Sequence, residues 1–268
     1  MKKDIGAGCD FMPEYLLKVF VFGIGACIGS FLNVCIYRLP AGKSVVTPAS
    51  CCPRCQHRLA PWDNIPLISF LWLRGRCRYC GLGISGRYWL VELITALGAL
   101  AVYEMAGLTP VALFHFIFMA ALIVVVFIDI DHQIIPDVIS LPGILIFLVA
   151  AILTGRLDWS ASLLGIAFGG GSLYLVALAY RLVKGVDGMG GGDIKLLAMI
   201  GAWCGMEGVI FTLLIGSVTG TLISLLIIII YRQNLQYRLP FGPFLSLGAI
   251  SYVFFGRELI TWYFVRLG

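Results

Sequence analysis

The sequence predicts an all-α, polytopic membrane protein with about eight transmembrane helices and a zinc-binding loop between the first and second of them. Three observations support this fold class. Of the 268 residues, 60% are hydrophobic and only 12% are charged, about half the charged share of a soluble domain. The apolar residues form long uncharged runs, most of them near the ~20 residues that a helix needs to cross a bilayer. Four cysteines stand as two C-x2-C pairs in the one sizeable polar segment.

Residues 1–37 are expected to form a polar tail followed by the first transmembrane helix. The first 15 residues hold five charged side chains and no strong periodicity. The following run, Leu16–Tyr37, is long enough to span the hydrocarbon and contains one charge, Lys18. Because its apolar part exceeds the ~7–15 residues of a cleavable signal core, we interpret it as a membrane helix and not as a signal peptide.

Residues 38–88 are polar and strongly basic, and they are expected to form a cytoplasmic loop. The segment holds eight arginines and lysines against a single acid, Asp63. The net charge of the whole chain, +5, follows the loops, as membrane topology requires. We therefore expect membrane lipid as a partner and no nucleic acid.

The two cysteine pairs in this loop have the spacing of metal ligands. Cys52 and Cys55 form the first pair, and Cys77 and Cys80 form the second after 21 intervening residues. Because each short turn directs two thiolates at one point, the four are predicted to hold a structural Zn²⁺ in a closed tetrahedral site. A pair of disulfides is the alternative, which a reducing cytoplasm disfavours. Cys51 adjoins the first pair and is not expected to be a ligand.

Residues 89–268 hold seven further apolar runs, which we interpret as a membrane domain of seven helices. One run, Ile194–Cys204, is short for a crossing and directly follows a glycine-rich stretch. Such broken segments line functional sites in membrane proteins. The seven runs are Trp89–Met105, Pro110–Ile128, Val138–Thr154, Ser160–Tyr180, Ile194–Cys204, Val209–Tyr231 and Phe244–Val265.

The distribution of lysine and arginine predicts the orientation of these helices. In the eight-span order, thirteen of these residues lie on the side of residues 38–88 and five on the opposite side, with Lys18 inside the first span. The positive-inside bias therefore places the loops that follow Ile128 and precede Ile194 in the cytoplasm. Both termini are expected to face outward.

Two aspartates are predicted to form a proteolytic dyad at the cytoplasmic face. Asp129 ends the run Pro110–Ile128, and Asp193 ends the glycine stretch 64 positions later. An acid at membrane level is costly and is by default a functional candidate. Two close carboxylates cannot both ionise, so one would keep a proton and polarise a carbonyl while the other activates water. The sequence leaves these two roles unassigned, because such a pair titrates as a unit.

Each acid in these loops also has a structural interpretation. Asp193 could cap the helix that begins at Ile194, and Asp137 could cap the helix that follows Pro136. Asp131 lies about 200° around the helix from Asp129, so only one of the two can face the glycine stretch.

Other functions find less support in the sequence. No H-E-x-x-H pair is present, which disfavours a zinc metalloprotease. Residues 83–86 match the G-x-S-G of a serine intramembrane protease, but they lie in a polar segment and are interpreted as a turn. A polytopic transporter with an intramembrane acidic site is the main alternative; both acids at one face and the absence of an evident repeat disfavour it. A thiol oxidoreductase would need the cysteine pairs on an oxidising side.

In their order along nearly the whole chain, these motifs resemble the type IV prepilin peptidase family, whose members are both leader peptidases and N-methyltransferases. The pattern shows no departure at the catalytic positions. The matching segments are Gly29–Val34, Arg38–Pro40, the cysteine pairs, Asn64–Pro66, Arg74–Cys77, Arg87–Tyr88 with Glu92, Ile128–Asp129, Pro136–Asp137, Gly190–Asp193 and Pro240–Pro243.

The resemblance implies an aspartyl protease of the G-x-G-D class in the bacterial inner membrane, with Asp129 and Asp193 as its catalytic pair. It implies a prepilin or pseudopilin substrate, of a type IV pilus or type II secretion system, that is cut after a glycine at the cytoplasmic face. It also implies that the new N-terminus is methylated from S-adenosylmethionine. The family alone places this second activity in the cytoplasmic region Arg38–Glu92, so residues 38–88 are expected to be the methyltransferase region and residues 89–268 the peptidase.

Overall fold

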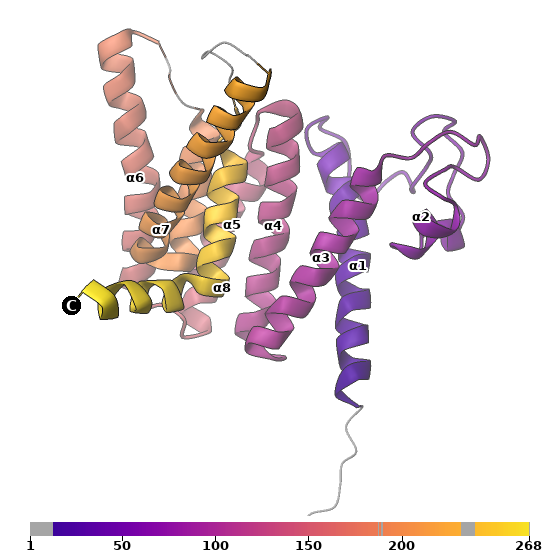
Figure 1. Cartoon of the computed structure of the whole chain (residues 1–268), viewed down its shortest axis with the longest axis horizontal. Helices are drawn as coiled ribbons and strands as arrows, with labels where there is room; N and C mark the ends of the chain where they lie inside the picture. Colours follow the sequence, from indigo (N-terminus) through magenta and orange to yellow (C-terminus); the bar gives the residue numbers. More distant parts are fainter. Residues whose placement is uncertain (1–12, 187, 189, 232–238, 268) are drawn as a thin grey trace, which may run out of the picture. The chain divides into compact units, whose positions relative to one another are not determined.

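The structure is a computed structural model that describes residues 13–267 except 187, 189 and 232–238. Residues 1–12 of the expected polar tail, Met189 of the glycine stretch, and Arg232 and Arg238 of the last loop lie outside the described residues. The described part is all-α, as predicted, with two isolated β-bridges and no strand (Figure 1). Its elements are α1 (Glu14–Arg38), η1 (Pro61–Asn64), α2 (Ile68–Trp72), α3 (Gly86–Ala106), α4 (Pro110–His132), α5 (Asp137–Leu153), α6 (Trp159–Lys184), α7 (Gly191–Tyr231) and α8 (Gly242–Leu267).

The predicted membrane spans correspond to these helices. Among the described residues, α1, α3, α4, α6 and α7 are long and apolar enough to cross a membrane, while α5 and the Gly242–Gly256 part of α8 are apolar but shorter. Helix α7 is broken at Gly205, where φ is 70° and ψ is −175°. The runs Ile194–Cys204 and Val209–Tyr231 therefore lie in two helical segments joined at one glycine. Counting both segments gives the eight apolar helices that the sequence predicts.

Short polar signals set where the helices begin and end. The Thr109 hydroxyl accepts the N–H of Ala112 at 3.1 Å and caps α4, a standard way to satisfy an orphan helix donor. The Ser85 hydroxyl accepts the N–H of Arg87 and caps α3 in the same way. The G-x-S-G at residues 83–86 is thus part of a helix start, in agreement with its interpretation as a turn.

The chain folds into two compact units. The first comprises Met1–Phe31 with Ser50–Gly107, and the second comprises Leu32–Ala49 with Leu108–Gly268. The division at residues 37/38 and 88/89 expected from the sequence remains a prediction.

In the first unit, α1 and α3 cross at close range because glycines face α3. A Cβ on Gly29 would stand 2.7 Å from the Cα of Glu92, too close for any side chain to fit without a shift. Near the start of α1, Lys18 Nζ lies 2.9 Å from a Glu14 oxygen and 2.8 Å from a Glu104 oxygen. The positive charge that the sequence places inside the first span therefore has two acidic partners.

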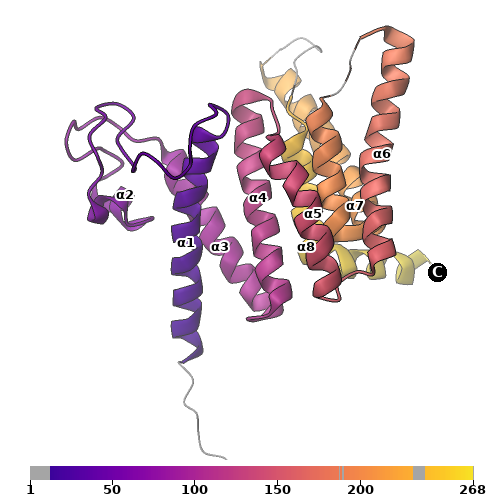
Figure 2. The same ribbon diagram turned by 180° about the vertical axis from the view of Figure 1, so that it is seen from behind.

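Helix α7 is the centre of the second unit and packs against α5, α6 and α8 (Figure 2). Its first segment carries fully buried side chains, including Leu196, Ile200 and Trp203. Helix α6 meets this segment backbone to backbone: a Cβ on Gly165 would overlap the carbonyl oxygen of Gly201, and a Cβ on Gly201 would overlap that of Gly165. The glycines thus let the two helices approach far closer than larger residues would allow.

The break at Gly205 leaves helix carbonyls without helical partners, and side chains from outside α7 satisfy two of them. The Ser162 hydroxyl donates to the Ala202 carbonyl at 2.7 Å. The Arg156 Nε donates to the Trp203 carbonyl at 3.1 Å. These bonds satisfy carbonyls at the C-terminal end of the first α7 segment. The N-terminal end of the same segment carries Asp193.

Candidate active site and metal centre

Asp129 lies in the last turn of α4 and points into the protein. It is 5% exposed, whereas Asp131 is exposed. The helix ends just beyond, where Gln133 adopts the left-handed conformation and donates its N–H to the Asp129 carbonyl at 2.9 Å. The predicted angular separation of the two acids is confirmed, and Asp129 is the one that faces inward.

Asp193 lies within the first turn of α7 and is half-buried. It is the third residue of that helix, so the interpretation as a capping residue before Ile194 is wrong. The glycine before it permits a close approach, because a Cβ on Gly192 would stand 2.9 Å from the Cβ of Ile135, in the loop that follows α4. Ile135 also lies beside Gly242, whose N–H bonds Asp129, so the two acids belong to one site, and the charge of Asp129 acts on the Asp193 carboxyl group. The fold thus brings together the two acids that are far apart in the sequence.

A third group at this site comes from α8. The backbone N–H of Gly242, the first residue of α8, donates to Asp129 Oδ2 at 3.0 Å in a buried hydrogen bond. Sequence reasoning included Gly242 in the Pro240–Pro243 segment of the family pattern but gave it no role. The sequence feature that could have indicated it is the run Pro240-Phe241-Gly242-Pro243, directly before an apolar segment.

Asp137 has a different role from the one predicted. The α5 N-cap residue is Pro136, and no side chain caps this helix. The Asp137 carboxylate instead accepts two hydrogen bonds from Lys195 Nζ, at 2.7 and 2.8 Å. The prediction of a capping acid is wrong because a lysine on α7 offers a full charge. The pair is exposed and so contributes little stability, but it links the start of α5 to the turn that carries Asp193.

The four cysteines predicted to be metal ligands converge in the first unit. Their sulfur atoms all lie within 4.8 Å of one another, and Cys51 is not part of the group. The sulfurs of Cys52 and Cys80 are 4.0 Å apart, close to the ~3.8 Å edge of a tetrahedral zinc–thiolate site and far beyond the ~2.05 Å of a disulfide. All four are free thiols. The arrangement fits a closed tetrahedral Zn²⁺ site.

The two cysteine pairs are built by the same local hydrogen bonds. The Cys52 N–H donates to the His57 carbonyl, and the Cys77 N–H donates to the Leu82 carbonyl, both at 2.9 Å. In the first turn, the N–H of Cys55 also bonds the Cys52 sulfur and lowers the pKa of this thiol to about 7. A thiol that ionises readily is suited to metal binding.

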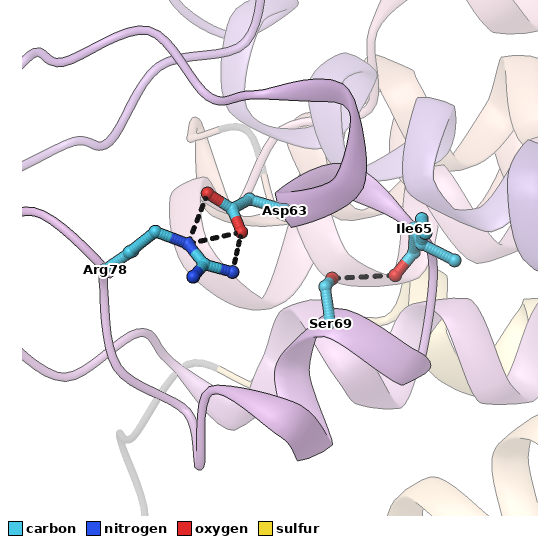
Figure 3. Close-up of polar contacts among 4 residues, drawn as sticks. All are labelled: Asp63, Ile65, Ser69 and Arg78. Atoms are coloured by element: carbon cyan, nitrogen blue, oxygen red, sulfur yellow. Dashed lines mark hydrogen bonds and ion pairs between the residues drawn. The ribbon is translucent and has the colours of Figure 1, made fainter.

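An ion pair fixes the rest of the loop. Arg78 pairs with the buried Asp63: its Nε donates to Oδ1 at 2.8 Å and to Oδ2 at 3.0 Å, and its Nη2 donates to Oδ1 at 2.7 Å (Figure 3). The single acid of the loop thus joins η1 to the second cysteine pair.

Hydrogen bonds fix the segment around α2. Glu92 on α3 accepts the N–H of Leu67 at 2.8 Å, and the Ser69 hydroxyl donates to the Ile65 carbonyl at 2.7 Å. The loop is therefore held by an ion pair and hydrogen bonds as well as by the cysteine cluster.

Two family descriptions match successive parts of the chain. The Bacterial Peptidase A24 N-terminal domain matches residues 24–105, which include the cysteine cluster. The Type IV leader peptidase family matches residues 116–225, which include Asp129 and Asp193. No solved structure matches the chain.

Curated relatives are similar over most of the chain. A prepilin leader peptidase/N-methyltransferase of Aeromonas salmonicida (strain A449) is 35% identical over 276 residues, which cover 93% of this chain and 94% of that protein. The protein of the same name from Pseudomonas aeruginosa is 35% identical over 279 residues, with 95% and 96% covered. That of Myxococcus xanthus is 39% identical over 221 residues, with 81% and 66% covered.

Proposed function

The chain belongs to the type IV leader peptidase family, and from this we infer that it is a prepilin leader peptidase and N-methyltransferase. It removes the leader of type IV prepilins and pseudopilins and then methylates the new N-terminal residue. The observation that supports the peptidase most directly is the meeting of Asp129 and Asp193, from the end of α4 and the start of α7.

We propose these two aspartates as the catalytic pair. The protonated member donates to the oxygen of the scissile carbonyl, and the ionised member accepts a proton from the attacking water. The carbon–nitrogen bond then breaks, and the proton taken from water passes to the leaving amine. This chemistry needs two neighbouring carboxyl groups that are partly shielded from water. Asp129 is buried, Asp193 is half-buried, and the charge of one acts on the other.

The transporter alternative is not supported. The relatives carry the name of a peptidase and methyltransferase, and the two acids meet at helix ends and not at mid-depth of the bundle. Both observations favour an enzyme.

We propose that residues 38–88 serve methyl transfer and residues 89–268 serve cleavage. Zn²⁺ held by Cys52, Cys55, Cys77 and Cys80 would be structural, since four thiolates leave no open position for substrate. S-adenosylmethionine supplies the methyl group that is transferred to the new amino terminus. The bidentate pair of Asp63 with Arg78 supports a folded loop, because both partners lie within residues 38–88.

Reconstitution tests the proposed function directly. Purified protein in lipid vesicles, mixed with a prepilin and labelled S-adenosylmethionine, is expected to release the leader and then label the new N-terminus. A mature pilin should be labelled without cleavage. Mass spectrometry of the product measures both steps, and an intact prepilin at the end of the reaction would contradict the assignment.

We also propose the inner membrane as the location, with residues 38–88 and both aspartates on the cytoplasmic side. This prediction rests on the uneven distribution of lysine and arginine. A reporter fused after Tyr231 is expected to read as cytoplasmic, and one fused at the carboxyl terminus as external. The opposite pattern would refute the eight-span topology.

A further inference from the structure

We propose that Gly242 positions Asp129 through its backbone N–H, and that Asp129 is the ionised member of the pair, which takes the proton of the attacking water. This inference rests on the proposed function of the two aspartates. It assigns the two roles that the sequence leaves open.

The first support is the hydrogen bond itself. The Gly242 N–H lies 3.0 Å from Asp129 Oδ2 and is buried. The residue opens α8, and the first N–H groups of a helix have no partner within it and stand at its positive end. The donor is therefore oriented by the α8 backbone and needs no side chain. One carboxylate oxygen, Oδ2, is thereby held in place.

The second support is the space at residue 242. A Cβ there would stand 2.6 Å from Asp129 Oδ2 and 3.3 Å from both Asp129 Cγ and Ile135 Cδ1. Gly242 is not among the glycines with positive φ, so its backbone conformation is open to other residues. Contact with the carboxyl group, and not the turn, is what requires a glycine at this position.

The third support is the difference between the two acids. A hydrogen bond donated to a carboxylate favours its charged form, and Asp129 receives one from Gly242. In the described part of the chain, no N–H donates to the Asp193 carboxyl group. Because a charge on one carboxyl group disfavours a charge on its neighbour, the donor favours the negative charge on Asp129 and leaves the proton on Asp193.

The assignment gives a balanced reaction. Asp129 takes a proton from water as the oxygen–carbon bond forms, and Asp193 gives its proton to the carbonyl oxygen. When the carbon–nitrogen bond breaks, the proton on Asp129 passes to the leaving amine. The carbonyl re-forms and returns a proton to Asp193, so both groups regain their starting states.

Replacement of Gly242 by alanine tests the positioning role. The added methyl meets the movable end of a side chain, so the protein is expected to fold while the carboxyl group shifts. A misplacement of about 1 Å can cost roughly 100-fold in rate. We expect a loss of this order in the kcat of leader cleavage, with KM, thermal midpoint and methylation of a mature pilin unchanged. Gly171→Ala on α6 is the matched control, because a Cβ there meets nothing within 4 Å, and it should behave like the wild type.

The pH profile of the same variant tests the assignment of roles. The other titratable groups at this end are Asp193 and Lys195 on α7, Asp131 and His132 on α4, and Asp137 on α5. If Asp129 is the base, its charged form loses a stabilising hydrogen bond in this variant and takes up a proton at higher pH. The acidic limb of the kcat profile therefore moves to higher pH, while the alkaline limb stays.

The contrary outcomes show which part of the proposal fails. A shift of the alkaline limb alone would overturn the role assignment, and wild-type kcat in Gly242→Ala would overturn the positioning. A fall in thermal midpoint together with methylation would make the contact merely structural and also overturn it. An active Asp129→Asn variant would instead refute the proposed catalytic pair, so the two failures are distinguishable.

Discussion

Asp129→Asn and Asp193→Asn are each expected to abolish leader cleavage while the protein stays inserted and still methylates a mature pilin. Asparagine keeps the size of aspartate, and at position 129 it can still accept the N–H of Gly242. It cannot exchange the proton that the reaction needs, and loss of general acid–base catalysis typically costs about 10²–10⁴-fold. The measurement is the rate of leader release from purified prepilin, beside the rate of methyl transfer on the same preparation.

Neighbouring aspartates provide the matched controls. Asp131→Asn changes an exposed carboxylate on the same helical turn and should retain substantial cleavage. Asp137→Asn should fall between, because it weakens the contact with Lys195 that links α5 to α7. An active Asp129→Asn variant beside an inactive Asp131→Asn variant would overturn the assignment.

Replacement of any one of Cys52, Cys55, Cys77 or Cys80 by serine is expected to remove the single zinc of the chain. Binding free energies of structural Zn²⁺ are about 10–16 kcal/mol and contribute directly to folding. Loss of the metal should therefore open residues 50–85 to proteolysis, because the bridge between the two turns is gone. Methyl transfer should suffer at least as much as cleavage. Elemental analysis and limited proteolysis measure the two effects.

Cys51→Ser is the control for the metal site. Its backbone pairs with that of Arg58, but its sulfur is not part of the cluster, so the metal should be retained. Thiol titration with and without a chelator separates zinc from disulfide, since only a metal site releases four thiols on chelation. Gently purified protein without zinc would contradict the prediction.

Sequence patterns predicted the features that depend on local spacing. Apolar runs placed the helices, the C-x2-C pairs predicted the convergence of four sulfurs, and the helical repeat predicted that Asp129 and Asp131 face apart. Contacts between distant segments were not predictable in this way. Gly242 reaches Asp129 across 113 positions only because α8 packs against α4. Local rules predicted Asp137 to be a helix cap. The packing of α5 on α7 instead brings Lys195 to its carboxylate.

The break at Gly205 has a consequence for how water reaches the aspartates. At about 1.5 Å per residue, the segment Gly191–Cys204 is about 21 Å long, short of the ~30 Å hydrocarbon thickness. Such a mismatch is relieved by local thinning of the bilayer or by a helix end that lies below its surface. In both cases the hydrocarbon barrier over the short segment is thinner than elsewhere. A hydrolase consumes one water molecule per cut, and a thinner barrier beside the helix that carries Asp193 shortens the path of that water to the two acids.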